Sequence, residues 1–288
     1  MTAFAGRTAG GACDRLRATL DDVAGAGRTV ALWWRDDDLQ RPTPQLDALL
    51  GELGGHGIVP GLAAVAGLLV PDAVAAAGAG RLLVHGWRHL NHSGPGTKKS
   101  EYGPERPLDV RLNEIAEAWR RLAAVAGDRA LPCFVPPWNR VGDDLPGRLD
   151  ATGIRVLSGF ASPHRAPVPA AVPRLDTHID LIDWRGGRTP LSAEAAAAAI
   201  DARIRAAGSC DRHDSPVDGP LGILSHHLVT DSAAWAGWRP LLAFLAGHPG
   251  VRWLDPAAAM AAVGGGAVGT ATSGMPGSGP GDETRRTG

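Results

Sequence analysis

The chain has few of the features that mark disulfide-bonded, membrane or nucleic-acid-binding proteins. Its 288 residues include only three cysteines, widely separated, which excludes a disulfide framework or a Cys-x-x-Cys metal knuckle. The 29 basic residues balance the 30 acidic ones, so no field of one sign attracts a polyanion. No apolar run reaches membrane-spanning length, and residues 1–22 lack the apolar core of a secretory signal. We therefore expect a cytoplasmic protein with no nucleic-acid or membrane partner.

The order of apolar patterns predicts an α/β fold. Short apolar segments at 29–34, 56–65, 81–85, 133–135, 154–157, 177–184, 221–227 and 251–254 predict strands. The segments between them carry helical spacing. A Gly-x-Gly-x-x-Gly phosphate loop is lacking, which favours a parallel barrel or an open sheet of another kind. Polar clusters follow five of these strands, at the end where the active sites of parallel barrels lie.

We expect three parts along the chain. Residues 1–28 would form an N-terminal helix that packs on the barrel, and residues 29–263 the catalytic domain. From about residue 264 the sequence is rich in glycine and serine, which predicts a disordered tail at 264–288.

Two short motifs predict a metal site. His85 and His89 are four residues apart, a spacing that can direct both imidazoles to one small cation. The run Asp36-Asp37-Asp38 follows an apolar strand and offers a third ligand and a spare base. An aspartate triplet alone is more often a solvated turn, and two histidines with one carboxylate also bind iron in oxygenases. In an oxygenase, however, the spare aspartate and a distant histidine at 226 would have no role.

These motifs, with three later segments, resemble the polysaccharide deacetylases of the NodB-homology type, in the carbohydrate esterase family 4 superfamily. The resemblance runs from about Thr29 to Leu254 and implies a distorted (β/α)7 barrel. It implies Asp37 as catalytic base and His226, in Leu224-Ser225-His226, as catalytic acid. It also implies that Asp38, His85 and His89 are the metal ligands.

The resemblance gives roles to two more segments. In Pro137-Trp138, a backbone N–H at Trp138 would help hold the oxyanion. In Asp183-Trp184, Asp183 would orient the catalytic acid and Trp184 would line the acyl pocket. The expected substrate contacts are Trp184, Trp87, Pro137, Asn139 and Arg140.

The sequence departs from the family pattern at two places. The aspartate run also permits a register in which Asp36 and Asp37 are the functional pair, although relatives with Arg-x-Asp-Asp and a following aliphatic residue favour Asp37 and Asp38. The arginine that begins the third motif is replaced by Val135, so Arg140 or Arg35 would have to steady the base.

The activity implied by the resemblance is a metal-dependent N-deacetylase acting on an amino sugar or polysaccharide, with Zn²⁺ as the expected ion. Five of the nine tryptophans fall in the motif segments, where indole rings could stack on sugar faces. The alternatives are a related hydrolase of a non-sugar amide or ester, and a catalytically silent carbohydrate-binding member. Because alternate strand residues face opposite ways, only one of His226 and His227 is expected to be catalytic.

Overall fold

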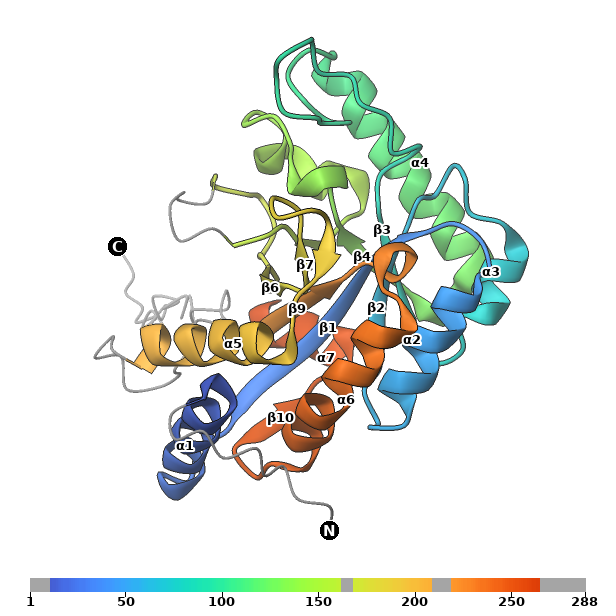
Figure 1. The fold of residues 1–288 in the computed structure, drawn as a ribbon. Coiled ribbons are helices and arrows are strands. Elements are labelled where there is room, and N and C mark those ends of the chain that lie inside the picture. The colour runs from blue at the N-terminus through green and yellow to red at the C-terminus, as the bar shows by residue number, and fades with distance from the viewer. Residues whose placement is uncertain (1–10, 162–167, 209–218, 265–288) are drawn as a thin grey trace, which may run out of the picture.

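The fold is built on a curled parallel sheet, as the alternation of patterns predicts. The computed structural model describes residues 11–161, 168–208 and 219–264, so the expected tail beyond Gly264 lies outside the described residues. The strands of the sheet follow the order β5-β4-β3-β2-β1-β9-β6 (Figure 1). Their bounds are β1 (Val30–Leu39), β2 (Pro60–Ala64), β3 (Arg81–Val84), β4 (Ala130–Phe134), β5 (Val156–Leu157), β6 (Thr177–Asp180) and β9 (Leu221–Ser225).

The two ends of this sheet meet, so the sheet closes on itself. Parallel bridges join Leu157 to Arg174 and Phe160 to Thr177, which links the end of β5 to the start of β6. An additional strand, β10 (Val251–Trp253), pairs with the beginning of β1. The expected distorted (β/α)7 barrel is therefore confirmed.

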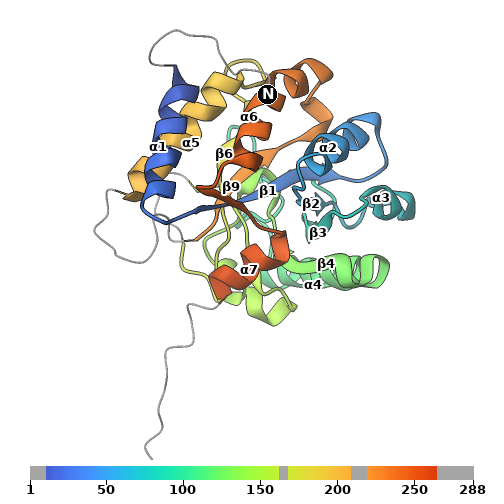
Figure 2. The same cartoon turned by 90° about the horizontal axis from the view of Figure 1, so that it is seen from below.

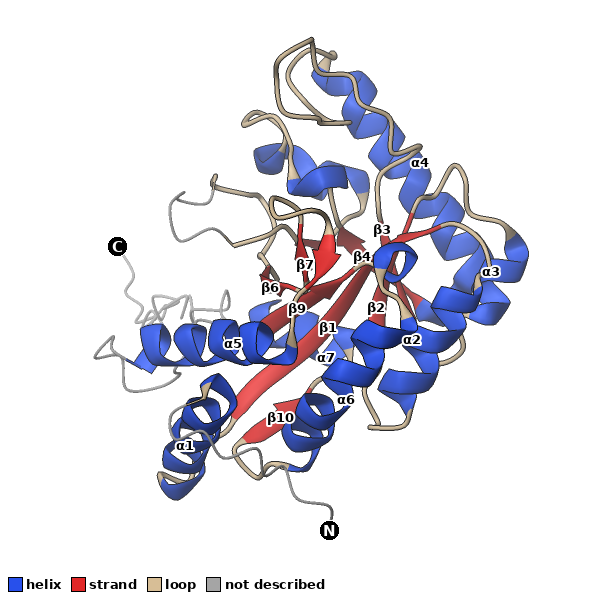
Figure 3. Ribbon diagram, in the orientation of Figure 1, coloured by secondary structure: helices blue, strands red, loops and turns tan. Residues whose placement is uncertain are grey.

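Helices α1 to α6 lie outside the strands, and α7 packs against the apolar cluster inside the barrel (Figures 2 and 3). Their bounds are α1 (Ala12–Gly25), α2 (Pro44–Gly54), α3 (Pro71–Ala76), α4 (Leu108–Ala126), α5 (Ala193–Gly208), α6 (Ser232–Gly247) and α7 (Pro256–Gly264), with short 3₁₀ turns η1 (Gly127–Arg129), η2 (Pro137–Asn139), η3 (Pro146–Thr152) and η4 (His227–Val229). Helix α2 starts as its sequence predicts, with Pro44 in the first turn and the Thr43 hydroxyl accepting the N–H of Leu46. Helix α1 packs against α5. No helix of the described chain is long and apolar enough to cross a bilayer.

The barrel has two apolar cores, and β1 contributes to both. Trp33 belongs to a small cluster inside the barrel with residues from β2 to β5 and from α7. Trp34 belongs to the larger cluster between the strands and the helices, where its ring lies 6.3 Å from that of Trp235 in α6. The period-two alternation of a strand explains this division. Cys133 is buried in the inner cluster.

The region expected as one strand at 177–184 is divided. After β6 the chain forms a separate hairpin of β7 (Ile182–Asp183) and β8 (Thr189–Pro190). This hairpin stands at the carboxyl end of the barrel and forms one wall of the site.

Candidate active site

A cavity of about 730 Å³ opens at the carboxyl end of the barrel strands. This volume is in the range of small-molecule binding sites. The lining comes from β1, from the segments that follow β3, β4 and β5, from β6 with its hairpin, and from the end of β9: Asp37, Asp38, His85, His89, Lys99, Trp138, Asn139, Arg140, Phe160, Asp180, Ile182, Asp183, Trp184, Arg185, Arg188 and His226.

Backbone strain is concentrated at this cavity. In the described chain, five residues other than glycine have positive φ, and all five line the cavity: Asp38, His89, Trp138, Asn139 and Arg188. Such conformations cost about 1–3 kcal/mol each and persist where the surrounding structure holds them, which is typical of functional sites.

All three predicted metal ligands lie together. Asp38 Oδ1 is 3.3 Å from His85 Nε2 and 3.3 Å from His89 Nε2. One ligand atom from each residue lies within 4.8 Å of the others. Burial alone raises the pKa of Asp38, but the hydrogen bond with His85 and the charges of both histidines outweigh it and hold the pKa well below the usual range. The carboxylate is therefore ionised, as a metal ligand must be.

Neighbouring groups orient the two histidines. His85 Nδ1 lies 2.9 Å from the carbonyl oxygen of Val135, so an N–H there leaves the Nε2 lone pair free for a cation. The ring of His89 packs on Trp138 with centroids 4.2 Å apart. Buried Glu101 accepts the backbone N–H of Arg88 at 2.7 Å and so supports the loop that carries His89. No sequence pattern marks Glu101, because its carboxylate binds backbone groups.

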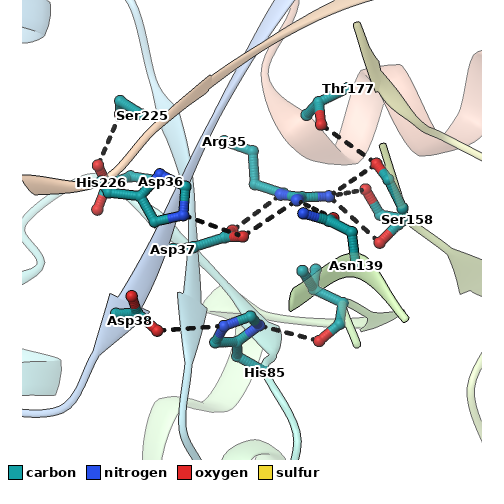
Figure 4. Close-up of polar contacts among 12 residues, drawn as sticks. Arg35, Asp36, Asp37, Asp38, His85, Asn139, Ser158, Thr177, Ser225 and His226 are labelled. Atoms are coloured by element: carbon teal, nitrogen blue, oxygen red, sulfur yellow. Dashed lines mark hydrogen bonds and ion pairs between the residues drawn. The ribbon is translucent and has the colours of Figure 1, made fainter. Parts of the chain in front are cut away.

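Asp37 is held by Arg35, which settles the choice between Arg35 and Arg140. The guanidinium contacts both carboxylate oxygens, with Nε–Oδ1 2.9 Å and Nη2–Oδ2 3.1 Å (Figure 4). Its other donors go to the carbonyls of Ser158 and Gly159, to the Ser158 hydroxyl and to Asn139 Oδ1 at 2.6 Å. Arg140 instead donates to the carbonyl oxygen of Lys99. Arg35 and Asp37 are two residues apart and so share the inner face of β1.

His226 stands between two carboxylates of the cavity lining, Asp37 and Asp180. Its Nε2 is 4.0 Å from Asp37 Oδ2, and its Nδ1 is 3.9 Å from Asp180 Oδ1. The indole of Trp184 meets the His226 ring edge-on at 4.8 Å and donates from Nε1 to Asp180 Oδ2. Burial raises the pKa of Asp180 above its ordinary value.

The residue beside His226 Nδ1 is Asp180, whereas the sequence analysis assigned this position to Asp183. The Asp183 carboxylate accepts the backbone N–H groups of Arg185 and Gly186 at 3.1 and 2.8 Å, so it stabilises the hairpin turn. Asp180 is the last residue of β6. Its place at the carboxyl end of a strand is the sequence feature that could have identified Asp180 as a site residue.

Two expected substrate contacts lie away from the cavity lining. Trp87 packs over Gly67, where a Cβ would meet both its ring and its carbonyl oxygen. Pro137 is buried against Gly86. Neither is among the lining residues, whereas Trp184, Asn139 and Arg140 are. Trp138 also lines the cavity. The two hydrogen bonds of its 3₁₀ turn come from Asn139 and Arg140, so the turn does not use the Trp138 N–H.

The alternative pair member, Asp36, faces the other way. It hydrogen-bonds His227 Nδ1 and accepts the Ser225 hydroxyl at 2.6 Å, and Ser225 in turn accepts Trp34 Nε1 at 2.8 Å. Burial alone lowers the pKa of His227, but the Asp36 charge reverses this and the pKa is raised. Asp36 and His227 are almost fully buried, with exposed fractions of 0% and 1%, and neither lines the cavity.

Comparison with known proteins finds similarity in solved structures alone; no protein-family model and no curated protein sequence matches the chain. A carbohydrate esterase of family 4 from Streptomyces lividans, solved with acetate, aligns with 17% identity and a TM-score of 0.48 over 77% of this chain and 90% of its own. A CE4 esterase of Streptococcus mutans aligns with 13% identity and a TM-score of 0.49 over 84% and 89%. A polysaccharide deacetylase of Bacillus cereus aligns with 20% identity and a TM-score of 0.41 over 74% and 89%. With TM-scores below one half, the chemistry must be derived from the residues of the cavity.

Proposed function

We propose that this chain is a metal-dependent hydrolase that removes N-acetyl groups from an amino sugar or a polysaccharide containing one. One observation carries the proposal: the Asp38–His85–His89 cluster lies beside an arginine-held carboxylate outside the cluster, Asp37, and His226 Nε2 is 4.0 Å from that carboxylate. A cation site with a separate base and acid suits the hydrolysis of an amide by activated water.

The donor set fits a divalent cation. Two imidazole nitrogens and one ionised carboxylate form a three-ligand set that leaves coordination positions open, and the Val135 carbonyl fixes the His85 tautomer. When bound, such an ion lowers the pKa of a coordinated water and polarises an acyl carbonyl. Zn²⁺ is our first choice because nitrogen and carboxylate ligands suit it, although such ligands also accept other divalent ions.

Asp37 is the proposed base. Its two oxygens are fixed by the Arg35 fork, and it lines the cavity next to Asp38 without belonging to the ligand cluster. It is thus positioned to take a proton from the attacking water. The Trp138 N–H is the proposed donor to the oxyanion that develops on the acetyl oxygen.

His226 is the proposed acid. The leaving amine needs a proton, because an amide nitrogen leaves poorly as an anion. The side chain of His226 is 12% exposed, so it is reachable from the cavity, and Asp180 faces its second nitrogen. Asp180 and Trp184 therefore replace Asp183 in our proposal as the groups that orient the acid. The products would be acetate and a free amine.

The case for a sugar depends on the cavity walls. Trp138 packs on His89, Trp184 meets His226 edge-on, and both indoles line the cavity. Indole faces bind the C–H faces of sugar rings. A hydrolase of non-sugar amides or esters is the second candidate, since nothing in the metal cluster itself distinguishes the acyl carrier.

The test is acetate release by the purified chain after metal removal by a chelator and reloading with Zn²⁺. Substrates are N-acetylated amino sugars, simple acetamides and an acetyl ester. We expect release from the sugars that depends on reloading. Release from simple amides or esters alone would favour the second candidate. Sugar binding without any turnover by the reloaded protein would contradict a catalytic role.

A further inference from the structure

Four cationic side chains surround the cavity in addition to the groups used in the proposed reaction. Lys99 and Arg140 belong to one wall, and Arg185 and Arg188 belong to the β7–β8 hairpin that forms another. Across residues 11–161, 168–208 and 219–264, none of the four has a carboxylate within ion-pair distance. Positive charge therefore stands unneutralised on two sides of the cavity.

The carboxylates that line the same cavity are already engaged. Asp37 is paired with Arg35, and Asp38 belongs to the metal cluster. Asp180 accepts the Ile182 N–H and Trp184 Nε1. Asp183 accepts two backbone N–H groups of its own turn. None of these carboxylates neutralises a cation of the rim.

The first wall is built so that its cations stay at the cavity. Arg140 donates from Nη1 to the Lys99 carbonyl at 3.1 Å, and Ser100 Oγ donates to the Arg140 carbonyl at 3.2 Å. Lys99 Nζ lies 5.9 Å from the centroid of the Trp138 ring, which itself packs on the metal-cluster residue His89. The Lys99 ammonium thus lies over an indole that packs on the ring of a proposed metal ligand.

Of the four cations, Arg140 gives the strongest argument for a bound anion. It is half-buried, and burial lowers the pKa of its guanidinium. Desolvating a cation without a counter-charge is unfavourable, and proteins usually compensate with a paired anion. Here the protein supplies only carbonyl oxygen, so an anion from outside would complete the site.

We propose that the substrate of this cavity is an N-acetylated amino sugar that carries an anionic group, a carboxylate or a phosphate, bound between Lys99 and Arg140 on one wall and Arg185 and Arg188 on the other. The inference rests on the proposed deacetylase function and narrows its substrate class. Arginine forks match both carboxylate and phosphate oxygens, so the chain itself does not separate these two anions.

The experiment measures binding and turnover with three small probes. N-acetylglucosamine is the neutral probe, N-acetylmuramic acid carries a carboxylate, and N-acetylglucosamine 6-phosphate carries a phosphate. Calorimetry on the Zn²⁺-loaded chain gives affinity, and acetate release gives kcat/KM. We expect at least one anionic probe to exceed the neutral one about ten-fold or more, with the excess shrinking as salt is added. The better of the two identifies the anion.

The variants are Arg140→Gln and the double variant Arg185→Gln/Arg188→Gln. Each should reduce the anionic-to-neutral ratio about ten-fold, because the lost charge acts on the anionic probes alone. The matched control is Arg252→Gln, an exposed arginine in β10 with no carboxylate partner in the described chain, at the opposite end of the barrel. It should leave the ratio unchanged. Thermal melting of each variant separates loss of binding from loss of fold.

The outcomes separate the two proposals. Acetate release from neutral and anionic probes alike, with equal affinities, would leave the deacetylase standing and overturn the anionic substrate. Tighter, salt-sensitive binding of an anionic probe that the arginine variants abolish, without any acetate release, would support the anion site and contradict the proposed reaction. If the anionic probes bind no more tightly than the neutral probe, the inference is wrong, whether or not acetate is released.

Discussion

The two faces of strand β1 use the same residue types for different purposes. On the inner face, Arg35 and Asp37 lead into the cavity, and Asp37 faces His226 at 4.0 Å. On the outer face, Asp36 hydrogen-bonds the next histidine, His227, directly and has no exposure. Both members of the inner pair line the cavity and can be reached from it, whereas the outer pair is closed and joins β1 to the end of β9. An Asp–His pair thus becomes available for catalysis when its geometry is left open.

The largest effect should come from the proposed metal cluster beside the inner face. His85→Ala or Asp38→Ala removes a ligand from a set of three, so we expect loss of nearly all bound metal and of acetate release. Metal content after dialysis and the rate of release check this together. The control is His92→Ala, an exposed histidine of the same loop outside the cavity lining, which should keep both. A His85 variant that keeps metal and full rate would refute the site.

Replacing each of the two histidines in turn tests the difference between the two faces. His226→Gln removes the proposed acid, and we expect acetate release to fall about 10²–10⁴-fold with little change in stability. His227→Gln removes the partner of buried Asp36, and we expect a loss of about 2–3 kcal/mol in unfolding free energy with a smaller effect on rate per folded molecule. Urea unfolding and initial rates on both variants check the division. Equal loss of rate in the two would contradict it.

Arg35→Lys tests how the inner base is held. Lysine keeps the charge but cannot offer the planar fork that binds both oxygens of Asp37, so we expect kcat to fall about 100-fold with KM little changed. The same exchange at Arg81, which pairs with Asp255 in a half-exposed site, is the control and should change the rate less than two-fold. A rise in KM with unchanged kcat would indicate a substrate contact instead.

The last and smallest effect concerns a third histidine, His178. Its pKa is lowered, so it stays neutral in the folded chain, whereas the pKa of His227 is raised. Burial lowers the pKa of His178 from 6.5 to about 4, and its Nδ1 accepts the Gly222 N–H. As pH falls from about 6.5 to about 4, the unfolded chain takes up a proton that the folded chain resists. Stability should therefore decline by at most ~1.4 kcal/mol per pH unit from this group.

Urea unfolding of His178→Gln and of the exposed-site control His92→Gln at several pH values measures this contribution. The His178 variant should lose part of the acid-side slope, and the control should keep it. An unchanged slope in the His178 variant would mean that the folded chain protonates this residue normally.

The sequence predicted the fold because the relevant signals are periodic. Alternating strands and helices gave the barrel, and polar clusters at strand ends located its active end. The close approach of Asp38, His85 and His89 follows from motifs that are short and local. Alternation also separated His226 from His227, as expected for neighbours in extended chain.

The remaining parts of the site depend on packing between distant segments. Asp180 rather than Asp183 faces His226 because β6 ends before a hairpin that the apolar pattern did not reveal. Trp87 turned away because Gly67, twenty residues earlier, leaves space for its ring. Glu101 acts on backbone groups, for which no side-chain motif exists. The sequence could not decide whether Arg35 or Arg140 binds Asp37. Both belong to segments of the predicted site, and the contact depends on how those segments pack.

The central claim, that the inner face of β1 carries the chemistry, is tested most directly by acetate release from an N-acetylated amino sugar by metal-loaded Asp37→Asn. This variant keeps the ligand set and removes only the proposed base. We predict that bound metal stays at the wild-type level while the rate falls about 10²–10⁴-fold. A wild-type rate in Asp37→Asn, together with a lost rate in a folded Asp36→Asn, would contradict the account and move the chemistry to the other face.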